Sequence, residues 1–262
     1  MDEELIAEAA GQLLGAYASG VPVTPLTTAY PGLSADDAYA IQVAQVTAWT
    51  ADGAVVKGHK VGLTSAAMQR QLGVDQPDFG HLLDRMFLPE GVTADYGRFA
   101  QPKAEPEIAF VLGRPLRGPG VTVAEALSAV DFILPALEII DSRIEDWKIT
   151  LPDTIADNAS SGAVVLGSRP VRPDAIDLPL TGCLLYRNGR IEGTGAGGAV
   201  LGSPVNALVW LANILGPRGV TLKPGHVVLP GSVCAAIPFG PGDTVSATFD
   251  RIGSVSITFS EK

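Results

Sequence analysis

The sequence is poor in residue types that several common classes of protein require. It has 2 cysteines among 262 residues, Cys183 and Cys234, which cannot build a disulfide framework and are predicted to be small core residues. No run approaches the ~18 consecutive apolar residues that a membrane span requires. The first residues, Met1 to Glu4, are acidic where a signal peptide would be basic. We therefore expect a soluble, cytoplasmic protein that does not act at a membrane.

Positive charge is also scarce. The chain has 18 Lys and Arg against 28 Asp and Glu, for a net charge of -10. Nucleic acids and anionic membranes are held by clusters of Lys and Arg, so this balance disfavours them as partners. Acidic side chains at fixed positions remain compatible with divalent cations. The 47% of hydrophobic residues is sufficient for a folded core.

Three sequence motifs of common enzymes are missing or incomplete. His59, His81 and His226 lack the spacing of metal ligands, and no G-x-S-x-G element supports a serine nucleophile. Residues 193–198 satisfy G-x-G-x-x-G, but no helix begins on them and no acid follows about 20 residues later. We interpret this stretch as a flexible loop that closes over a site, not as a nucleotide-binding turn.

The pattern of apolar residues divides the chain into a helical and a β-rich part. Apolar residues recur at helical spacing near the N-terminus, and Ser34 is a predicted N-cap of a second helix. A capping box at Thr122 and Glu125, and Ser203 before Pro204, predict two later helices. Short β-rich runs are predicted at 55–61, 107–112, 132–140, 163–166, 183–186, 191–194, 227–229, 245–249 and 255–259. The sequence thus predicts an α+β fold, with a helical N-terminal segment over 1–54 and a mainly antiparallel sheet core over 55–262.

Three glutamates are candidates for a metal site. Glu105 and Glu107 alternate on a predicted strand, so their side chains share one face, with Cα atoms ~6–7 Å apart. Glu138 lies in an otherwise apolar run, where an unpaired carboxylate would cost several kcal/mol. A solvated strand face for the pair, and an ion pair of Glu138 with Arg143 or Lys60, are simpler alternatives. If the three acids converge, all-oxygen ligation favours Mg²⁺ or Mn²⁺ over zinc.

Lys60 and two polar segments are weaker candidates. Lys60 ends an apolar strand between glycines, where it is either an ordinary surface lysine or a group that binds a carboxylate or transfers protons. The segments 75–80 and 157–162 are rich in turn-forming residues and are predicted to be loops.

Taken together, six segments in order resemble the 2-keto-4-pentenoate hydratase family of the fumarylacetoacetate hydrolase superfamily. They are GHKVGLT at 58–64, GVDQPDFG at 73–80, AEPEIAF at 104–110, PALEIIDSRI at 135–144, DNAS at 157–160 and GSVS at 253–256. The resemblance runs from about residue 35 to the end. It implies a mixed β-roll of the fumarylacetoacetate hydrolase C-terminal type over 55–262, as the metal-binding catalytic domain, in a homo-oligomer.

The resemblance also implies roles for single residues. Metal ligands fall on Glu105, Glu107 and Glu138, which would hold Mg²⁺ or Mn²⁺. Catalytic groups fall on Lys60 and Asp78. The residues that bind substrate fall on Lys60, Leu63 and Ser160.

The chain departs from the family pattern at two positions. Pro106 replaces the small residue between the two acids, which removes a backbone donor but keeps both side chains. Ser203 stands where many relatives have histidine, which leaves the substrate open.

The implied activity is that of a metal-dependent hydro-lyase of aromatic meta-cleavage catabolism. It would add water to a 2-hydroxy-2,4-dienoate and yield a 4-hydroxy-2-oxo acid. Alternatives are 4-oxalocrotonate decarboxylase, a hydratase of a longer dienoate such as 2-oxohept-4-ene-1,7-dioate, and a non-catalytic subunit that supports a partner enzyme. Association with a neighbouring enzyme of the pathway is also expected.

Overall fold

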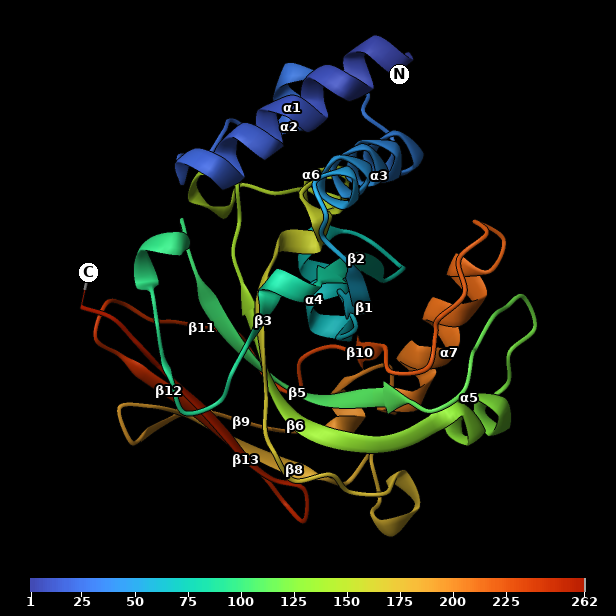
Figure 1. Ribbon diagram of the computed structural model, residues 1–262, viewed down its shortest axis with the longest axis vertical. Coiled ribbons are helices and arrows are strands. Elements are labelled where there is room, and N and C mark those ends of the chain that lie inside the picture. Colours follow the sequence, from blue (N-terminus) through green and yellow to red (C-terminus); the bar gives the residue numbers. More distant parts are fainter. Residues whose placement is uncertain (262) are drawn as a thin grey trace.

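Helices at the N-terminus form a layer at one end of the molecule (Figure 1). The structure is a computed structural model that describes residues 1–261, with the side chains at 68, 71 and 72 left aside. The layer consists of α1 (Glu3–Ser19), α2 (Leu26–Ala29) and α3 (Ala35–Ala51). The Asp2 side chain caps α1, and Ser34 forms a capping box with Asp37 at the start of α3, so the predicted N-cap is confirmed.

The remainder of the chain is built on two curled sheets. One sheet has the strand order β2-β1-β10-β5-β6-β7-β3, with β11 paired to β5, and the other has the order β4-β13-β12-β8-β9. The first sheet comprises β1 (Val56–Gly62), β2 (Asp78–Leu83), β3 (Phe87–Leu88), β5 (Lys103–Leu112), β6 (Val130–Ile140), β7 (Ser161–Leu166), β10 (Val227–Leu229) and β11 (Ile237–Pro238). The second comprises β4 (Thr93–Ala94), β8 (Gly182–Arg187), β9 (Arg190–Ala196), β12 (Thr244–Phe249) and β13 (Gly253–Phe259). Most neighbouring strands are antiparallel, so the predicted α+β fold with a mixed β-roll is confirmed.

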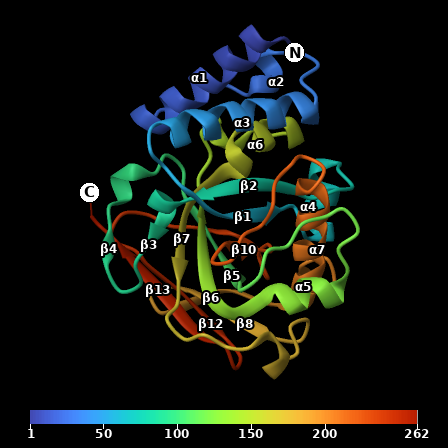
Figure 2. The same cartoon turned by 45° about the vertical axis from the view of Figure 1, so that its right-hand side comes forward.

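The main hydrophobic core lies between these sheets and the helices at their side. Its fully buried side chains include Phe110, Ile133 and Leu137 of the first sheet and Phe249 of the second. Four further helices connect the strands, namely α4 (Ala66–Leu72), α5 (Val123–Ala129), α6 (Leu151–Ala156) and α7 (Pro204–Leu215). Figure 2 shows α5 and α7 beside the sheets and α6 beneath the N-terminal layer.

One stretch of the described chain, Gly197–Leu215, is apolar and long enough to pass as a membrane span on length and composition. Its α-helical part is α7, which has 12 residues and is therefore about 18 Å long, against the ~30 Å of a bilayer core. Leu208 and Leu211 of α7 are fully buried in the main core. We therefore interpret α7 as a core helix.

Two local predictions were wrong. Residues 75–80 were predicted to be a loop, but β2 begins at Asp78 and pairs with β1 over its full length. The glycine-rich stretch is not a flexible loop, because residues 193–196 belong to β9. Gly195 packs so closely that a Cβ atom there would lie 1.9 Å from the Val233 carbonyl oxygen. The helix predicted after Ser203 is confirmed, because Ser203 is the N-cap of α7 and Pro204 its first residue, although the Ser203 side chain makes no capping bond.

Candidate active site

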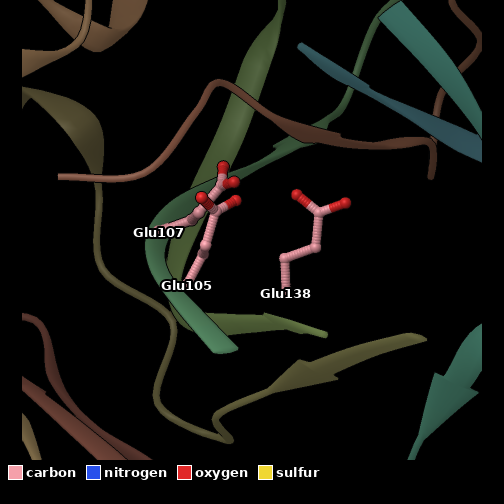
Figure 3. Close-up of side chains that lie close together, drawn as sticks. All are labelled: Glu105, Glu107 and Glu138. Atoms are coloured by element: carbon pink, nitrogen blue, oxygen red, sulfur yellow. The ribbon is translucent and has the colours of Figure 1, made fainter. Parts of the chain in front are cut away.

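The three predicted glutamates meet on two neighbouring strands. Glu105 and Glu107 project from one face of β5, and the antiparallel register places Glu105 directly opposite Glu138 of β6. Figure 3 shows the three side chains projecting to the same side, with their carboxylates next to one another. One carboxylate oxygen from each residue lies within 4.8 Å of the others. The register of β5 against β6 is continuous through Pro106, so this proline leaves both acids on the same face.

Burial leaves these carboxylates short of partners. Glu107 and Glu138 are at most 1% exposed, and Glu107 accepts one hydrogen bond, from the Gly231 amide to Oε2 at 2.7 Å. Its Oε1 atom and both oxygens of Glu138 have no hydrogen-bond partner in residues 1–261. Unsatisfied buried carboxylates are unfavourable unless they meet a cation or take up a proton.

The pKa values of the three glutamates also indicate that the cluster requires a cation or protons. Burial raises the pKa of Glu105 to about 7, with a further contribution from the charge of Glu138. Burial and the two neighbouring carboxylates raise the pKa of Glu107 well above its usual range, and burial also raises the pKa of Glu138. A hard divalent cation prefers oxygen ligands and would keep all three groups ionised. The donor set thus fits a divalent metal.

Lys60 reaches the same cluster from β1. Its side chain is buried, so the surface-lysine alternative is wrong. The Nζ atom donates to the Ala159 carbonyl at 2.8 Å and lies 3.4 Å from Oε1 of Glu138. Burial opposes the charge of Lys60, but Glu138 and Asp78 outweigh it and raise the pKa of the amine. Of the two simple ion-pair partners considered for Glu138, the structure places Lys60 beside it, whereas Arg143 pairs with Asp157.

Asp78 lies next to Lys60 at the start of β2. It is 1% exposed, and burial raises the pKa of its carboxyl despite the opposing charge of Lys60. Its register partner on β1 is Gly62, where a Cβ atom would lie 2.1 Å from Oδ1 of Asp78. Only glycine at position 62 therefore leaves room for this carboxylate.

A cavity of about 650 Å³ joins these groups. Its lining includes five of the predicted site residues, which are Lys60, Leu63, Asp78, Glu105 and Ser160. Glu107 and Glu138 do not line the cavity; their oxygens lie beside those of Glu105, which does. The structure therefore brings every predicted site residue to one place.

The polar segment before β7 is buried and not a solvated turn. Residues 157 to 160 are at most 3% exposed, and Ser160 faces the cavity, with its hydroxyl 3.3 Å from that of Thr154. Sequence reasoning missed Thr154, and it missed Lys103, which also lines the cavity with its Nζ 4.0 Å from the centre of the Trp147 ring. Lys103 had a usable signal, because it alternates with Glu105 and Glu107 on one strand face. Thr154 and Trp147 had none, since both reach the cavity through tertiary packing.

The three histidines lie close together in the structure, although their spacing in the sequence did not indicate this. His59 and His81 pair across β1 and β2 with ring centres 4.9 Å apart, and the ring of His226 lies 6.2 Å from that of His59. Burial lowers the pKa of His59 well below its usual range and that of His81 to about 4. Cys183 is buried in the main core, as predicted, whereas Cys234 is only half-buried and lines the cavity, so the prediction of a core residue was wrong for it.

The comparisons with known proteins agree with this geometry. The fumarylacetoacetate (FAA) hydrolase C-terminal family matches residues 59–260. A 2-keto-4-pentenoate hydratase of Paraburkholderia xenovorans (strain LB400) is 46% identical over 96% of this chain and 94% of its own. A 2-oxo-hept-4-ene-1,7-dioate hydratase of Escherichia coli is 44% identical over 88% of each chain.

A solved structure covers almost the whole chain. It is 4-oxalocrotonate decarboxylase from Pseudomonas putida G7 in complex with magnesium and adipate. This chain superimposes on it with a TM-score of 0.95 and 34% identity, over 99% of this chain and 98% of that one. With the acid cluster and the matched family, these similarities show that the chain belongs to the 2-keto-4-pentenoate hydratase family of the fumarylacetoacetate hydrolase superfamily.

Proposed function

We propose that this protein is a metal-dependent hydro-lyase that adds water to a 2-hydroxy-2,4-dienoate of the 2-keto-4-pentenoate type. The product is a 4-hydroxy-2-oxo acid, and the reaction belongs to aromatic meta-cleavage catabolism. The observation that carries the proposal is the convergence of three carboxylates, Lys60 and Asp78 at one cavity. Relatives that are 46% and 44% identical over most of the chain and are named as hydratases support it.

We assign the metal site to Glu105, Glu107 and Glu138 and the metal to Mg²⁺ or Mn²⁺. All-oxygen ligation by carboxylates suits these ions, and the decarboxylase that this chain resembles was solved with magnesium. When bound, the cation would supply Lewis-acid stabilisation of negative charge on the 2-oxygen of the substrate. Leu63 and Ser160 line the part of the cavity that would hold the carbon chain of the substrate.

Two side chains of the protein move protons. Despite its burial, the neighbouring carboxylates raise the pKa of Lys60 and hold it in its ammonium form. Lys60 delivers a proton to C5 of the dienoate and takes up the proton that the 2-hydroxyl releases, so that its charge is restored. The resulting conjugated 2-oxo acid accepts the hydroxyl group of water at C4, and the proton that Asp78 takes from this water is passed on to C3. Asp78 orients this water and accepts its proton, a role that suits a buried carboxyl of raised pKa.

Two other activities have specific support. The 0.95 TM-score to 4-oxalocrotonate decarboxylase favours decarboxylation of a 2-oxohexenedioate as the second candidate. The 44% identity to a 2-oxo-hept-4-ene-1,7-dioate hydratase favours a longer dienoate. The products formed from 2-oxohex-3-enedioate distinguish a decarboxylase from a hydratase, because decarboxylation releases CO₂ and hydration yields a hydroxy acid.

The oligomeric state and the cellular location are inferred from the same family membership. We infer a homo-oligomer in the cytoplasm that associates with a neighbouring enzyme of the pathway. We also infer that residues 55–262 act as the metal-binding catalytic domain, with residues 1–54 as a separate helical segment. Sedimentation of the purified protein, alone and mixed with the next enzyme of the pathway, tests the assembly.

The central experiment follows the loss of diene absorbance of 2-hydroxypenta-2,4-dienoate. We expect turnover by the wild type with Mg²⁺ or Mn²⁺, loss of turnover in EDTA, and loss in Glu107→Gln. Glu192→Gln, at an exposed carboxylate that pairs with Arg187, is the matched control and should behave as the wild type. Unchanged turnover in Glu107→Gln would reject the metal role. Tight binding of a 2-oxo acid without turnover of any dienoate would favour the non-catalytic alternative.

A further inference from the structure

Lys60 takes its direction from an unusual turn of the backbone. Its Nζ donates to the carbonyl of Ala159 at 2.8 Å. Asn158, Ala159 and Ser160 all have positive φ angles, of 50°, 51° and 54°. Residues other than glycine adopt this conformation rarely and usually singly. Three in succession persist only where the surrounding structure holds them, so those contacts decide where the carbonyl that binds Lys60 points.

One side of the turn is held by β2. The Asn158 side chain accepts a hydrogen bond from the His81 amide at 2.7 Å and donates one to the His81 carbonyl at 2.9 Å. The Asn158 carbonyl accepts a bond from the Ser161 hydroxyl at 2.8 Å. It also lies close to Gly80, where a Cβ atom would be only 2.4 Å away.

The other side of the turn rests on a buried ion pair. Asp157, which directly precedes the turn, is fully buried. Arg143 donates to it three times, from Nε to Oδ1 at 2.6 Å, from the backbone amide to Oδ2 at 2.9 Å, and from Nη2 to the backbone carbonyl at 3.0 Å. A planar guanidinium can hold a side chain and a carbonyl of one residue together in this way, and a lysine amine cannot.

The N-terminal helices close over this pair. The ring of Tyr17 in α1 stacks on Arg143, with 4.1 Å between the guanidinium carbon and the ring centre. The Tyr17 hydroxyl donates to the Ser161 carbonyl at 3.4 Å, and its ring contacts the edge of Trp49 in α3. The helical layer therefore reaches the residue that follows the turn.

We propose that Arg143, covered by Tyr17, is a positioning residue for Lys60, and that it acts through Asp157 and the left-handed turn 158–160. The inference rests on the proposed function, in which Lys60 delivers the proton. Arg143 does not line the cavity among the described residues, so its effect on the reaction passes through the Ala159 carbonyl. The segment outside the β-roll thus contributes to the orientation of the catalytic amine.

The test compares Arg143→Lys with the wild type in Mn²⁺. Displacement of a catalytic group by about 1 Å costs roughly 10²-fold, so we expect kcat to fall by about that factor. The dissociation constant for Mn²⁺, measured by calorimetry, should stay at the wild-type value, because the three assigned metal ligands are untouched. KM should rise, because Ser160 of the same turn lines the cavity. A merely structural role would leave kcat per folded molecule unchanged, and that result would overturn the proposal.

Two further variants keep the test informative if Arg143→Lys folds poorly. Tyr17→Leu removes the ring that stacks on Arg143, together with the hydroxyl bond to the Ser161 carbonyl and the contact with Trp49. Because Arg143 itself remains, we expect kcat to fall by about tenfold with unchanged Mn²⁺ binding. Arg172→Lys changes an exposed arginine paired with Asp174 and should match the wild type. Wild-type kcat in a folded Tyr17→Leu protein would count against the proposal.

A crystal structure of Arg143→Lys separates this inference from the proposed function. We expect the 2.8 Å contact between Lys60 Nζ and the Ala159 carbonyl to be lost there, while Glu105, Glu107 and Glu138 keep their positions. An intact contact would overturn the positioning role whatever the substrate. Absence of turnover of every dienoate by the wild type would instead reject the proposed function alone.

Discussion

At the scale of single residues, the site is defined by charges that have few partners. Glu105 faces Glu138 across two paired strands, an arrangement of like charges that destabilises a sheet unless a cation lies between them. Lys60 contacts only one of these acids, at 3.4 Å. A single amine cannot balance three carboxylates, so the cluster depends on a second positive charge.

Lys60→Met should abolish proton transfer and leave the metal site intact. General acid catalysis contributes about 10²–10⁴-fold, so kcat should fall within that range. Binding of Mn²⁺, followed by electron paramagnetic resonance, should persist because the three ligands remain. Lys57→Met, at an exposed position three residues earlier, is the matched control. Retention of most of the activity by Lys60→Met would remove this lysine from the mechanism.

Gly62→Ala should damage the site through one methyl group. A Cβ atom there would lie 2.1 Å from Oδ1 of Asp78, so the carboxylate must move, and we expect kcat to fall by about 10². Gly15→Ala is the control. Position 15 lies in α1 with nothing within 4 Å of the added atom, and the change should stabilise the protein by about 0.5–1 kcal/mol. Steady-state kinetics and thermal unfolding of both variants check this, and equal kinetics would show that Asp78 tolerates displacement.

At the scale of elements, the residue patterns predicted the strands made mainly of apolar residues and missed the two-residue strands and β2. β6 and β10 are mainly apolar, and the predicted 132–140 and 227–229 match them closely. β2 was missed because Asp75, Pro77 and Gly80 are typical turn residues. Tertiary contacts override that tendency here, since β2 is buried on both faces and pairs with β1.

The same limit applies to the site. Glu105 and Glu107 could be placed on one face by strand alternation alone. Their meeting with Glu138 could not, because it depends on the register between two strands, and only the resemblance to a family indicated it. The left-handed turn at 158–160 had no signal in sequence, since none of its residues is glycine.

The β1–β2 pair should make the fold sensitive to acid. His59 and His81 are buried, and the pKa of His81 is lowered to about 4. In the unfolded chain a histidine takes up a proton below its ordinary pKa of ~6.5, whereas buried His81 stays neutral in the folded protein until about pH 4. Its contribution to the free energy of unfolding is therefore fully present above about pH 6.5 and is lost as the pH drops toward 4. For His81 alone the loss approaches about 3 kcal/mol. Buried carboxyls of raised pKa, such as Glu105 and Asp157, change stability in the opposite direction. Urea unfolding of the wild type and His81→Leu, each near pH 7 and near pH 5, therefore measures the effect as the difference between the two proteins.

Removal of one of these histidines should weaken that dependence. His59→Leu leaves an apolar side chain in an enclosed position and removes one group that the unfolded chain protonates, so the acid limb of its stability curve should be flatter than that of the wild type. An identical pH dependence in the two proteins would show that His59 does not contribute.

At the scale of the whole molecule, metal binding and folding are linked but separable. The main core is packed from apolar side chains of both sheets, such as Phe110, Leu137 and Phe249, and the raised pKa values of the three glutamates let protons neutralise them when no cation is bound. The protein should therefore stay folded in EDTA and gain stability with Mg²⁺, by about 2.7 kcal/mol at a hundred times the dissociation constant. Far-UV circular dichroism and thermal unfolding with and without the ion check this. Complete unfolding in EDTA would show that the metal is structural.

The metal effect should itself depend on pH. Without the ion, the pKa of Glu105 is raised to about 7, so protons compete with the cation, and affinity should decline as the pH falls below that value. Calorimetric titration of Mn²⁺ between about pH 6 and pH 8 measures the trend. Glu192→Gln should show the wild-type trend, and a pH-independent affinity would mean that the cluster is already ionised.

The pairing of β5 with β6 has a consequence for how such enzymes diversify. The three glutamates that we assign as metal ligands lie on two neighbouring strands, β5 and β6, in fixed register. Leu63, Trp147 and Ser160 reach the cavity from other parts of the chain. A substitution at one of these lining residues would leave the three glutamates in place. Proteins built on this strand pair could therefore change from hydration to decarboxylation through substitutions in the cavity lining alone, while the three carboxylates stay in place.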